Sequence, residues 1–187
     1  MALGIACIIA VPLGALCARK KIFRDVITGV FSTFRIIPSL GVLFLCIPVM
    51  GIGVKPALTA LCFLAIPPIL INTTTAFSSI AAPVLETARG MGMNSRRIFF
   101  TVKTPLALPL ILTGFKTAAA EVIASATLVA YIGGGGLGTI IFTGLQVMRN
   151  DLLIIGGASV ALLSISADYL LSGLERAVIK SIFGVLR

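Results

Sequence analysis

The sequence predicts an all-helical integral membrane protein with five membrane spans, which together make 1–187 a single transmembrane domain. Two observations support this fold class. First, 58% of the residues are hydrophobic, the mean hydropathy is +1.15, and only 11% of the residues are charged. Soluble domains carry charge on about a quarter of their residues. Second, long apolar runs alternate with short segments that hold most of the Lys and Arg residues.

The apolar runs are separated by turn residues or by basic segments, and their lengths approach the ~20 residues that a spanning helix needs. We expect spans at residues 1–18, 36–53, 57–72, 111–131 and 152–171. Between the first two, apolar residues from Ile22 to Phe34 recur on one helical face, which favours a helix lying in the membrane interface. The Pro67-Pro68 pair should break the third span, because proline lacks the N–H group that a helix requires.

The later turns can also be placed. Pro105 and Pro109 mark the approach to the fourth span, and the run 133–138 predicts an outer turn followed by a short helix over 139–149. Close helix packing is the simplest role for the small residues Gly134, Gly138, Gly156 and Gly157.

Basic residues orient the chain, because Lys and Arg are retained on the cytoplasmic side of a membrane. Their distribution predicts an external N-terminus and an internal C-terminus. Only Lys55 and Arg149 fall outside, while Arg35 and Lys116 lie near inner boundaries where long side chains snorkel. The inner residues are Arg19, Lys20, Lys21, Arg24, Arg89, Arg96, Arg97, Lys103, Arg176, Lys180 and Arg187. The net charge of +9 therefore reflects membrane orientation and indicates no nucleic-acid partner.

Several kinds of active site are excluded or disfavoured by the residues present. The chain has no His and no G-x-x-x-x-G-K-[ST] motif, so we expect no cofactor and no ATP site in this chain. Gly133, Gly135 and Gly138 match G-x-G-x-x-G, but no strand precedes them, and a tight turn is the better interpretation. The cysteines lie in apolar runs without C-x-x-C spacing, which predicts buried thiols and no metal site: Cys7, Cys17, Cys46 and Cys62.

Polar residues inside the spans are candidates for a translocation path. Thr117, Glu121 and Ser125 recur every four residues and so share one face of the fourth span. A carboxylate at mid-membrane costs roughly 2.5–3.5 kcal/mol on insertion scales, so Glu121 should face protein or water. It either lines the path of a cationic solute or pairs with Lys116 or a neighbouring hydroxyl. We expect Asp168 to pair with a basic loop. Further lining candidates are Ser39, Asn72 and Thr73.

The polar stretch 79–104 cannot lie in lipid, and its residues predict a helix–turn–helix on the cytoplasmic face. Pro83 suits a first helical turn, Gly90 and Gly92 allow the chain to turn, and Asn94 or Ser95 can cap a second helix. Spacing alone equally allows a plain connecting loop.

Glu86, Ala88 and Gly92 in this stretch, with Pro105 directly after it, resemble the signature of bacterial ABC-importer permeases: E-A-A, three residues, Gly, nine residues, I-x-L-P. The chain departs from it at Thr87, Val102 and Thr104. The resemblance implies a type I importer permease with a coupling helix between spans three and four that docks on the ATPase. The coupling residues would be Glu86, Ala88, Arg89, Gly92, Arg96 and Pro105.

Four further motifs resemble the osmoprotectant branch of this family, which imports glycine betaine, carnitine and choline: I-I-P-S-L (36–40), G-I-G-V-K-P-A (51–57), E-T-A-R-G-M-G-M (86–93) and A-T-L-V-A-Y-I-G-G-G-G-L-G (126–138). The implied partners are a cytosolic ATPase dimer carrying ATP and Mg²⁺, a second permease subunit, an extracytoplasmic binding protein and membrane lipid. The alternatives are a methionine- or phosphonate-type permease, a channel or scaffold, and, least favoured, an intramembrane enzyme.

Overall fold

The computed structural model describes residues 1–184, and in that range the chain consists of helices and turns without a β-strand. The all-helical prediction is therefore confirmed, while Arg187 lies outside the described residues. In chain order the helices are α1 (Ala2–Cys17), α2 (Lys21–Phe34), α3 (Ser39–Met50), α4 (Val54–Ser78), α5 (Ala82–Gly90), α6 (Ser95–Ile98), the π-helix η1 (Phe99–Lys103), α7 (Thr104–Ala126), the 3₁₀ helix η2 (Leu128–Ile132), α8 (Gly138–Gln146) and α9 (Asn150–Phe183).

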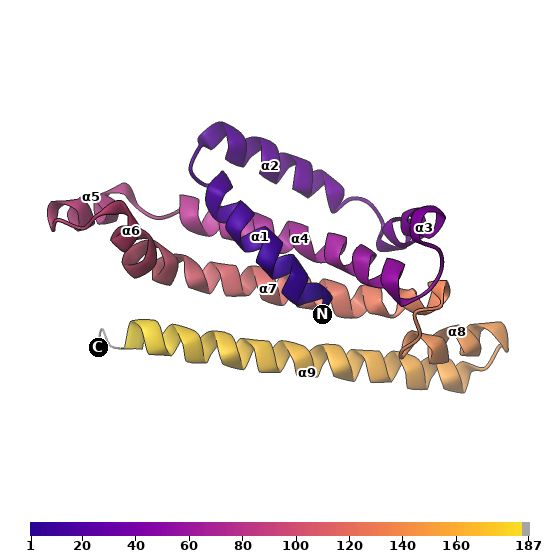
Figure 1. The fold of residues 1–187 in the computed structure, drawn as a ribbon. Coiled ribbons are helices and arrows are strands. Elements are labelled where there is room, and N and C mark those ends of the chain that lie inside the picture. The colour runs from indigo at the N-terminus through magenta and orange to yellow at the C-terminus, as the bar shows by residue number, and fades with distance from the viewer. Residues whose placement is uncertain (185–187) are drawn as a thin grey trace.

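Helix α4 is the centre of the bundle and packs along both α1 and α7 (Figure 1). Small residues allow the close approach of α1, whose buried positions recur every four residues: Ala2, Ala6, Ala10 and Gly14. A Cβ atom at Gly14 would stand 2.7 Å from the Cβ atom of Thr73 on α4. The apolar core continues from this seam toward Ile69 and Ala118, so α1, α4 and α7 form one packed unit.

Proline does not interrupt the long helices where the sequence predicts a break. Helix α4 runs through Pro67 and Pro68, both buried against neighbouring helices. The fourth helix begins well before residue 111, because α6, η1 and α7 form one continuous helix over Ser95–Ala126. Its π-helical turn precedes Pro105, and the Thr104 hydroxyl donates to the Phe99 carbonyl at 2.9 Å. Prolines persist in such helices because local adjustments and neighbours satisfy the freed backbone groups.

The second span differs most from its prediction. Helices α2 and α3 meet at an angle of 89°, and α3 has only 12 residues, or ~18 Å of helix. Helix α2 packs on α4 and α1 and runs along the bundle in Figure 1. The bend lies before Pro38, where the preceding residue is disfavoured in the helical region. The helix expected over Ile22–Phe34 is therefore confirmed as α2, whereas the straight span expected at 36–53 is replaced by a shorter helix bent away from α2.

Among the described residues, three helices are long and apolar enough to cross a membrane, namely Val54–Ser78, Ser95–Ala126 and Asn150–Ser181. The bent α2–α3 pair could provide a fourth, whereas α1 is a shorter apolar helix. Figure 1 places α5, α6 and the C-terminal part of α9 at one end of the bundle, and α3, α8 and the start of α9 at the other. The turn and short helix predicted after residue 132 are confirmed, with positive φ at Gly133, Gly135 and Gly136.

Candidate functional site

The polar stretch 79–104 folds as the predicted helix–turn–helix, made of α5, a tight turn and α6. Gly92 has φ +77°, a conformation that side chains with a Cβ atom rarely adopt, and its N–H donates to the Arg89 carbonyl at 2.9 Å. Asn94, and not Ser95, caps the second helix by accepting from the Arg97 N–H at 2.8 Å. The turn therefore depends on the left-handed backbone of Gly92 and on the Asn94 side chain that caps α6.

The six candidate coupling residues divide into two groups. Glu86, Arg89, Gly92 and Arg96 are exposed at the surface of the hairpin. Ala88 is only 5% exposed, and its carbonyl accepts from the Met93 N–H at 3.2 Å, which ties α5 to the turn. Pro105 is half-buried at the start of α7. The exposed residues thus form a surface that carries both acidic and basic side chains, and the buried Ala88 lies beneath it.

Glu121 pairs with Arg35, a partner that the sequence did not suggest. The Arg35 guanidinium donates to a Glu121 carboxylate oxygen at 2.7 Å across 86 residues of sequence. Their side chains stay 45% and 35% exposed, so both remain accessible to a solute. Leu64 and Pro67, at the middle of α4, line the same cavity as this pair. Arg35 therefore lies at mid-helix depth and not at the expected inner boundary.

The cavity around this ion pair has a volume of about 630 Å³ and is mainly apolar. It brings together three of the five candidate path residues, Ser39, Glu121 and Ser125. Asn72 and Thr117 do not line it. The Asn72 amide donates to the Pro68 carbonyl at 2.8 Å, and the Thr117 hydroxyl donates to the Thr113 carbonyl at 3.0 Å.

Thr73 is fully buried against α1, and its hydroxyl has no hydrogen-bond partner within the described residues. This further lining candidate therefore lies in a helix–helix seam and not at a cavity.

A second polar network links α7 to α9. The Lys116 ammonium donates to the Ser172 hydroxyl at 2.8 Å and lies 3.7 Å from Asp168 and 3.8 Å from Glu175. The Thr113 hydroxyl donates to Glu175 at 3.0 Å. The expectation that Asp168 pairs with a basic loop is wrong, and Lys116 is bound between helices. Sequence spacing could not reveal contacts across more than 50 residues.

Aromatic residues also gather in a way the sequence did not reveal. Tyr131 makes edge-to-face contacts with Phe44, at a centroid distance of 6.0 Å, and with Phe142, at 4.6 Å. These rings come from α3, η2 and α8, at the end of the bundle opposite the hairpin. In the part of the chain that the structure describes, no three His, Cys, Asp or Glu residues are placed to hold a metal ion.

Comparison of the sequence with known families matches it to a component of a transport system. Residues 10–180 match the family model described as "Binding-protein-dependent transport system inner membrane component". The match covers nearly all of the described helices, including the hairpin and the Glu121 cavity.

Three curated relatives support the same family. The glycine betaine/carnitine/choline transport system permease protein OpuCB of Bacillus subtilis is 38% identical over 95% of this chain and 82% of its own length. The choline transport system permease protein OpuBB of the same organism is 39% identical over 90% and 78%. The carnitine transport permease protein OpuCB of Listeria monocytogenes is 39% identical over 92% and 78%.

The fold also matches a solved transporter. An inward-facing structure of the MetNI methionine ABC transporter superposes with a TM-score of 0.81 over 95% of this chain and 89% of that chain, at 24% identity. At that identity the likeness establishes the ABC permease fold alone. The predicted importer permease is confirmed as a multi-pass, non-catalytic membrane subunit whose system also includes an ATPase and a substrate-binding protein. The chain belongs to the family of inner-membrane components of binding-protein-dependent transport systems.

Proposed function

We propose that this chain is the permease subunit of an ABC importer for quaternary-ammonium osmoprotectants: glycine betaine, carnitine and choline. The observation that carries the proposal is 38–39% identity, over at least 90% of the chain, to permeases named for these solutes. The methionine alternative has weaker support, because the methionine transporter shares the fold at 24% identity. No observation favours a phosphonate importer.

The substrate proposal is tested by uptake into proteoliposomes that contain the permease and its ATPase, with binding protein outside. We expect labelled glycine betaine, carnitine or choline to accumulate and labelled methionine to stay outside. Ergothioneine belongs in the same panel, because the Helicobacter pylori permease/binding protein EgtU is 36% identical over 88% of this chain. Uptake of methionine alone would remove the osmoprotectant assignment and leave the family unchanged.

The path for the solute runs past Glu121 in this proposal. A quaternary ammonium carries a positive charge, and the Arg35 guanidinium occupies the place beside the carboxylate that such a charge would take. Ser39 and Ser125 add hydroxyl groups to an otherwise apolar cavity that can hold a small solute. Asn72 and Thr117 would reach the path only after helix movement, since both donate hydrogen bonds within their own helices.

A charge-neutral substitution separates this path role from a structural one. Glu121→Gln should reduce transport of cationic solutes more than it reduces ATP hydrolysis, because it removes charge from the cavity and keeps side-chain size. Asp168→Asn is the control, because it also removes a carboxylate charge at constant side-chain size and lies outside that cavity. Equal losses of transport and hydrolysis in Glu121→Gln would contradict the path role.

The hairpin couples the permease to its ATPase in this proposal. Glu86, Arg89 and Arg96 present charge at the end of the bundle, and Gly92 fixes the turn between α5 and α6. Ala88 is buried inside the hairpin, and Pro105 lies in the first turn of α7, where the helix continues from it. Gly92→Trp or Glu86→Lys should reduce the permease-dependent stimulation of ATP hydrolysis, while Gly157→Ala, on an open face of α9, should leave it intact. Stimulation unchanged in both hairpin variants would contradict the coupling role.

The working assembly contains two ATPase subunits and a second permease subunit, because one bundle of this size leaves its Glu121 cavity open on one side. Five helices cross the membrane in this arrangement, with α1 and the bent α2–α3 pair as the two shortest crossings. The N-terminus lies outside, while the hairpin and the C-terminus lie inside. Support comes from the basic residues at the hairpin end and from the position of α5, α6 and the end of α9 in Figure 1.

A further inference from the structure

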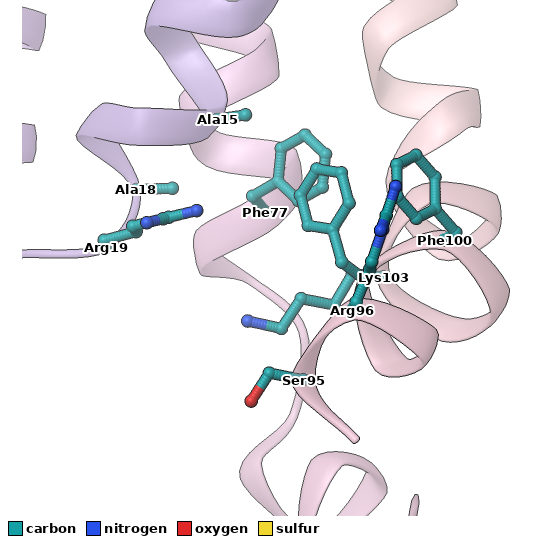
Figure 2. Close-up of a pocket in the computed structure, with 9 residues that line it drawn as sticks. Ala15, Ala18, Arg19, Phe77, Ser95, Arg96, Phe100 and Lys103 are labelled. Carbon is teal, nitrogen blue, oxygen red and sulfur yellow. The ribbon is translucent and has the colours of Figure 1, made fainter. Parts of the chain in front are cut away.

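A cavity of about 520 Å³ lies at the hairpin end of the bundle, separate from the cavity around Glu121. Its walls come from the end of α1, the end of α4 and the start of the continuous helix Ser95–Ala126. Arg19, Arg96 and Lys103 all line it. Figure 2 shows Arg19 and Lys103 extending toward one another from opposite sides, with the Ser95 hydroxyl below them. We refer to it as the basic cavity.

Within residues 1–184, no acidic group compensates the charge of the basic cavity. No Asp or Glu lines it, and its three cations take part in none of the ion pairs found in the described residues. Like charges around one cavity repel each other, most strongly where water is partly excluded. Lys103 is half-buried there. An anion bound between the cations would remove this repulsion and accept charge-assisted hydrogen bonds.

Apolar groups form the rest of the basic cavity. The rings of Phe77 and Phe99 stack at a centroid distance of 5.6 Å and an interplanar angle of 5°. Phe100 lines it as well and is 63% exposed, while Ala15 adds a small apolar surface from α1. A free inorganic anion would not use these contacts. A molecule with an anionic group beside a hydrocarbon part would contact both the cations and the aromatic rings of the basic cavity.

The depth of the basic cavity matches the surface of a membrane. Helix α4 has 25 residues and so is ~37 Å long, several ångströms longer than the ~30 Å hydrocarbon core. Phe77 is the second-last residue of α4, and Arg19 follows the end of α1. Both therefore lie where a spanning helix leaves the hydrocarbon. In the proposed orientation this is the cytoplasmic leaflet, where anionic lipids attract basic residues.

We propose that the basic cavity binds the phosphate group of an anionic phospholipid. Arg19 and Lys103 hold the phosphate from the two sides, and Ser95 donates a further hydrogen bond. The lipid's hydrocarbon part lies against Phe77 and Phe100. Because its walls belong to α1 and to the helix that carries the hairpin, the bound lipid links these two parts of the permease. Only the choice of leaflet rests on the proposed function.

The test places a single reporter in the cavity. The native chain has no Trp, so Phe100→Trp gives one fluorophore that lines the site. The full chain is reconstituted in phosphatidylcholine nanodiscs that contain equal fractions of either brominated phosphatidylglycerol or brominated phosphatidylcholine. Bromine quenches nearby Trp, so the comparison measures which lipid occupies the cavity. We expect several-fold stronger association of phosphatidylglycerol, and equal quenching by the two lipids would overturn the proposal.

Charge substitutions test which residues hold the lipid. Arg19→Gln/Lys103→Gln in the reporter chain should abolish the several-fold phosphatidylglycerol preference, because a single cation near an anionic membrane surface is already worth about five-fold. Lys20→Gln/Arg97→Gln removes the same charge from the same end without touching the cavity lining, and should keep the preference. Loss of the preference in both double variants would indicate a diffuse surface potential and contradict a built site.

Two additions distinguish the other possible occupants. Inorganic phosphate should not displace the brominated lipid, and displacement would show a small-anion site instead. Adding the ATPase should leave the quenching unchanged, with the Trp-free native chain supplying the background of the ATPase. Loss of quenching on ATPase binding would assign the basic cavity to the subunit interface. Neither measurement uses solute or ATP, so failure here is distinct from failure of the proposed transport function.

Discussion

Gly114 provides the sharpest test of the packing of α4 against α7. A Cβ atom at this position would stand 2.6 Å from the Asn72 Cβ atom and 3.0 Å from the Pro68 carbonyl oxygen. Ordinary contacts begin at 3.4 Å, so Gly114→Ala would require the two helices to separate locally by about 0.8 Å. Neither contacting atom is the end of a flexible side chain. Overpacking of this kind costs about 1–3 kcal/mol.

The assay is thermal unfolding of the purified chain in detergent. For a chain of this size, a loss of about 1–3 kcal/mol corresponds to a melting temperature lower by roughly 2–12 °C. Gly157→Ala on α9 is the matched control, because a Cβ atom there meets nothing within 4 Å. We expect that control to melt at or slightly above the native temperature, since alanine favours helix more than glycine does. Equal melting temperatures for the two variants would refute the packing argument.

Three further predictions concern individual contacts. Asn94→Ala removes the cap of α6 and should cost about 0.5–2 kcal/mol locally, seen as faster hydrogen exchange in the first turn of that helix; unchanged exchange would exclude the cap. Lys116→Met leaves Glu175 without its cation and should lower the melting temperature more than Lys55→Met, and equal effects would argue against the network between α7 and α9. In a double-mutant cycle, Arg35→Gln and Glu121→Gln should show a coupling energy of at least about 0.5 kcal/mol, and strict additivity would show that the pair does not interact.

The sequence predicts the features that depend on local patterns. Long apolar runs predict the helical fold class, and Gly92 followed by Asn94 predicts the turn. The structure confirms that turn, with positive φ at Gly92 and an Asn94 cap on α6. The residues of 79–104 left a hairpin and a plain connecting loop equally open, and the resemblance to the permease signature favoured the hairpin. These features need only neighbouring residues to be interpreted.

Contacts between distant segments could not be predicted in the same way. Glu121 pairs with Arg35 because α2 packs along α4, which brings Arg35 at the end of α2 close to α7. The proline rule predicted a break at Pro67, yet the helix continues because its neighbours support it. The sequence placed Thr117, Glu121 and Ser125 on one helix face, but only Glu121 and Ser125 line the cavity, because tertiary packing decides which side chains reach it.

Above all, this permease should move its solute only when ATP and a binding protein are both present. The direct measurement is initial uptake of labelled glycine betaine, carnitine and choline into proteoliposomes that contain permease and ATPase. Each preparation is measured with and without internal ATP, and with and without external binding protein. We predict accumulation of at least one solute only when both are supplied. Uptake that needs neither, and stops at equal concentrations on the two sides, would show a channel and contradict the importer mechanism.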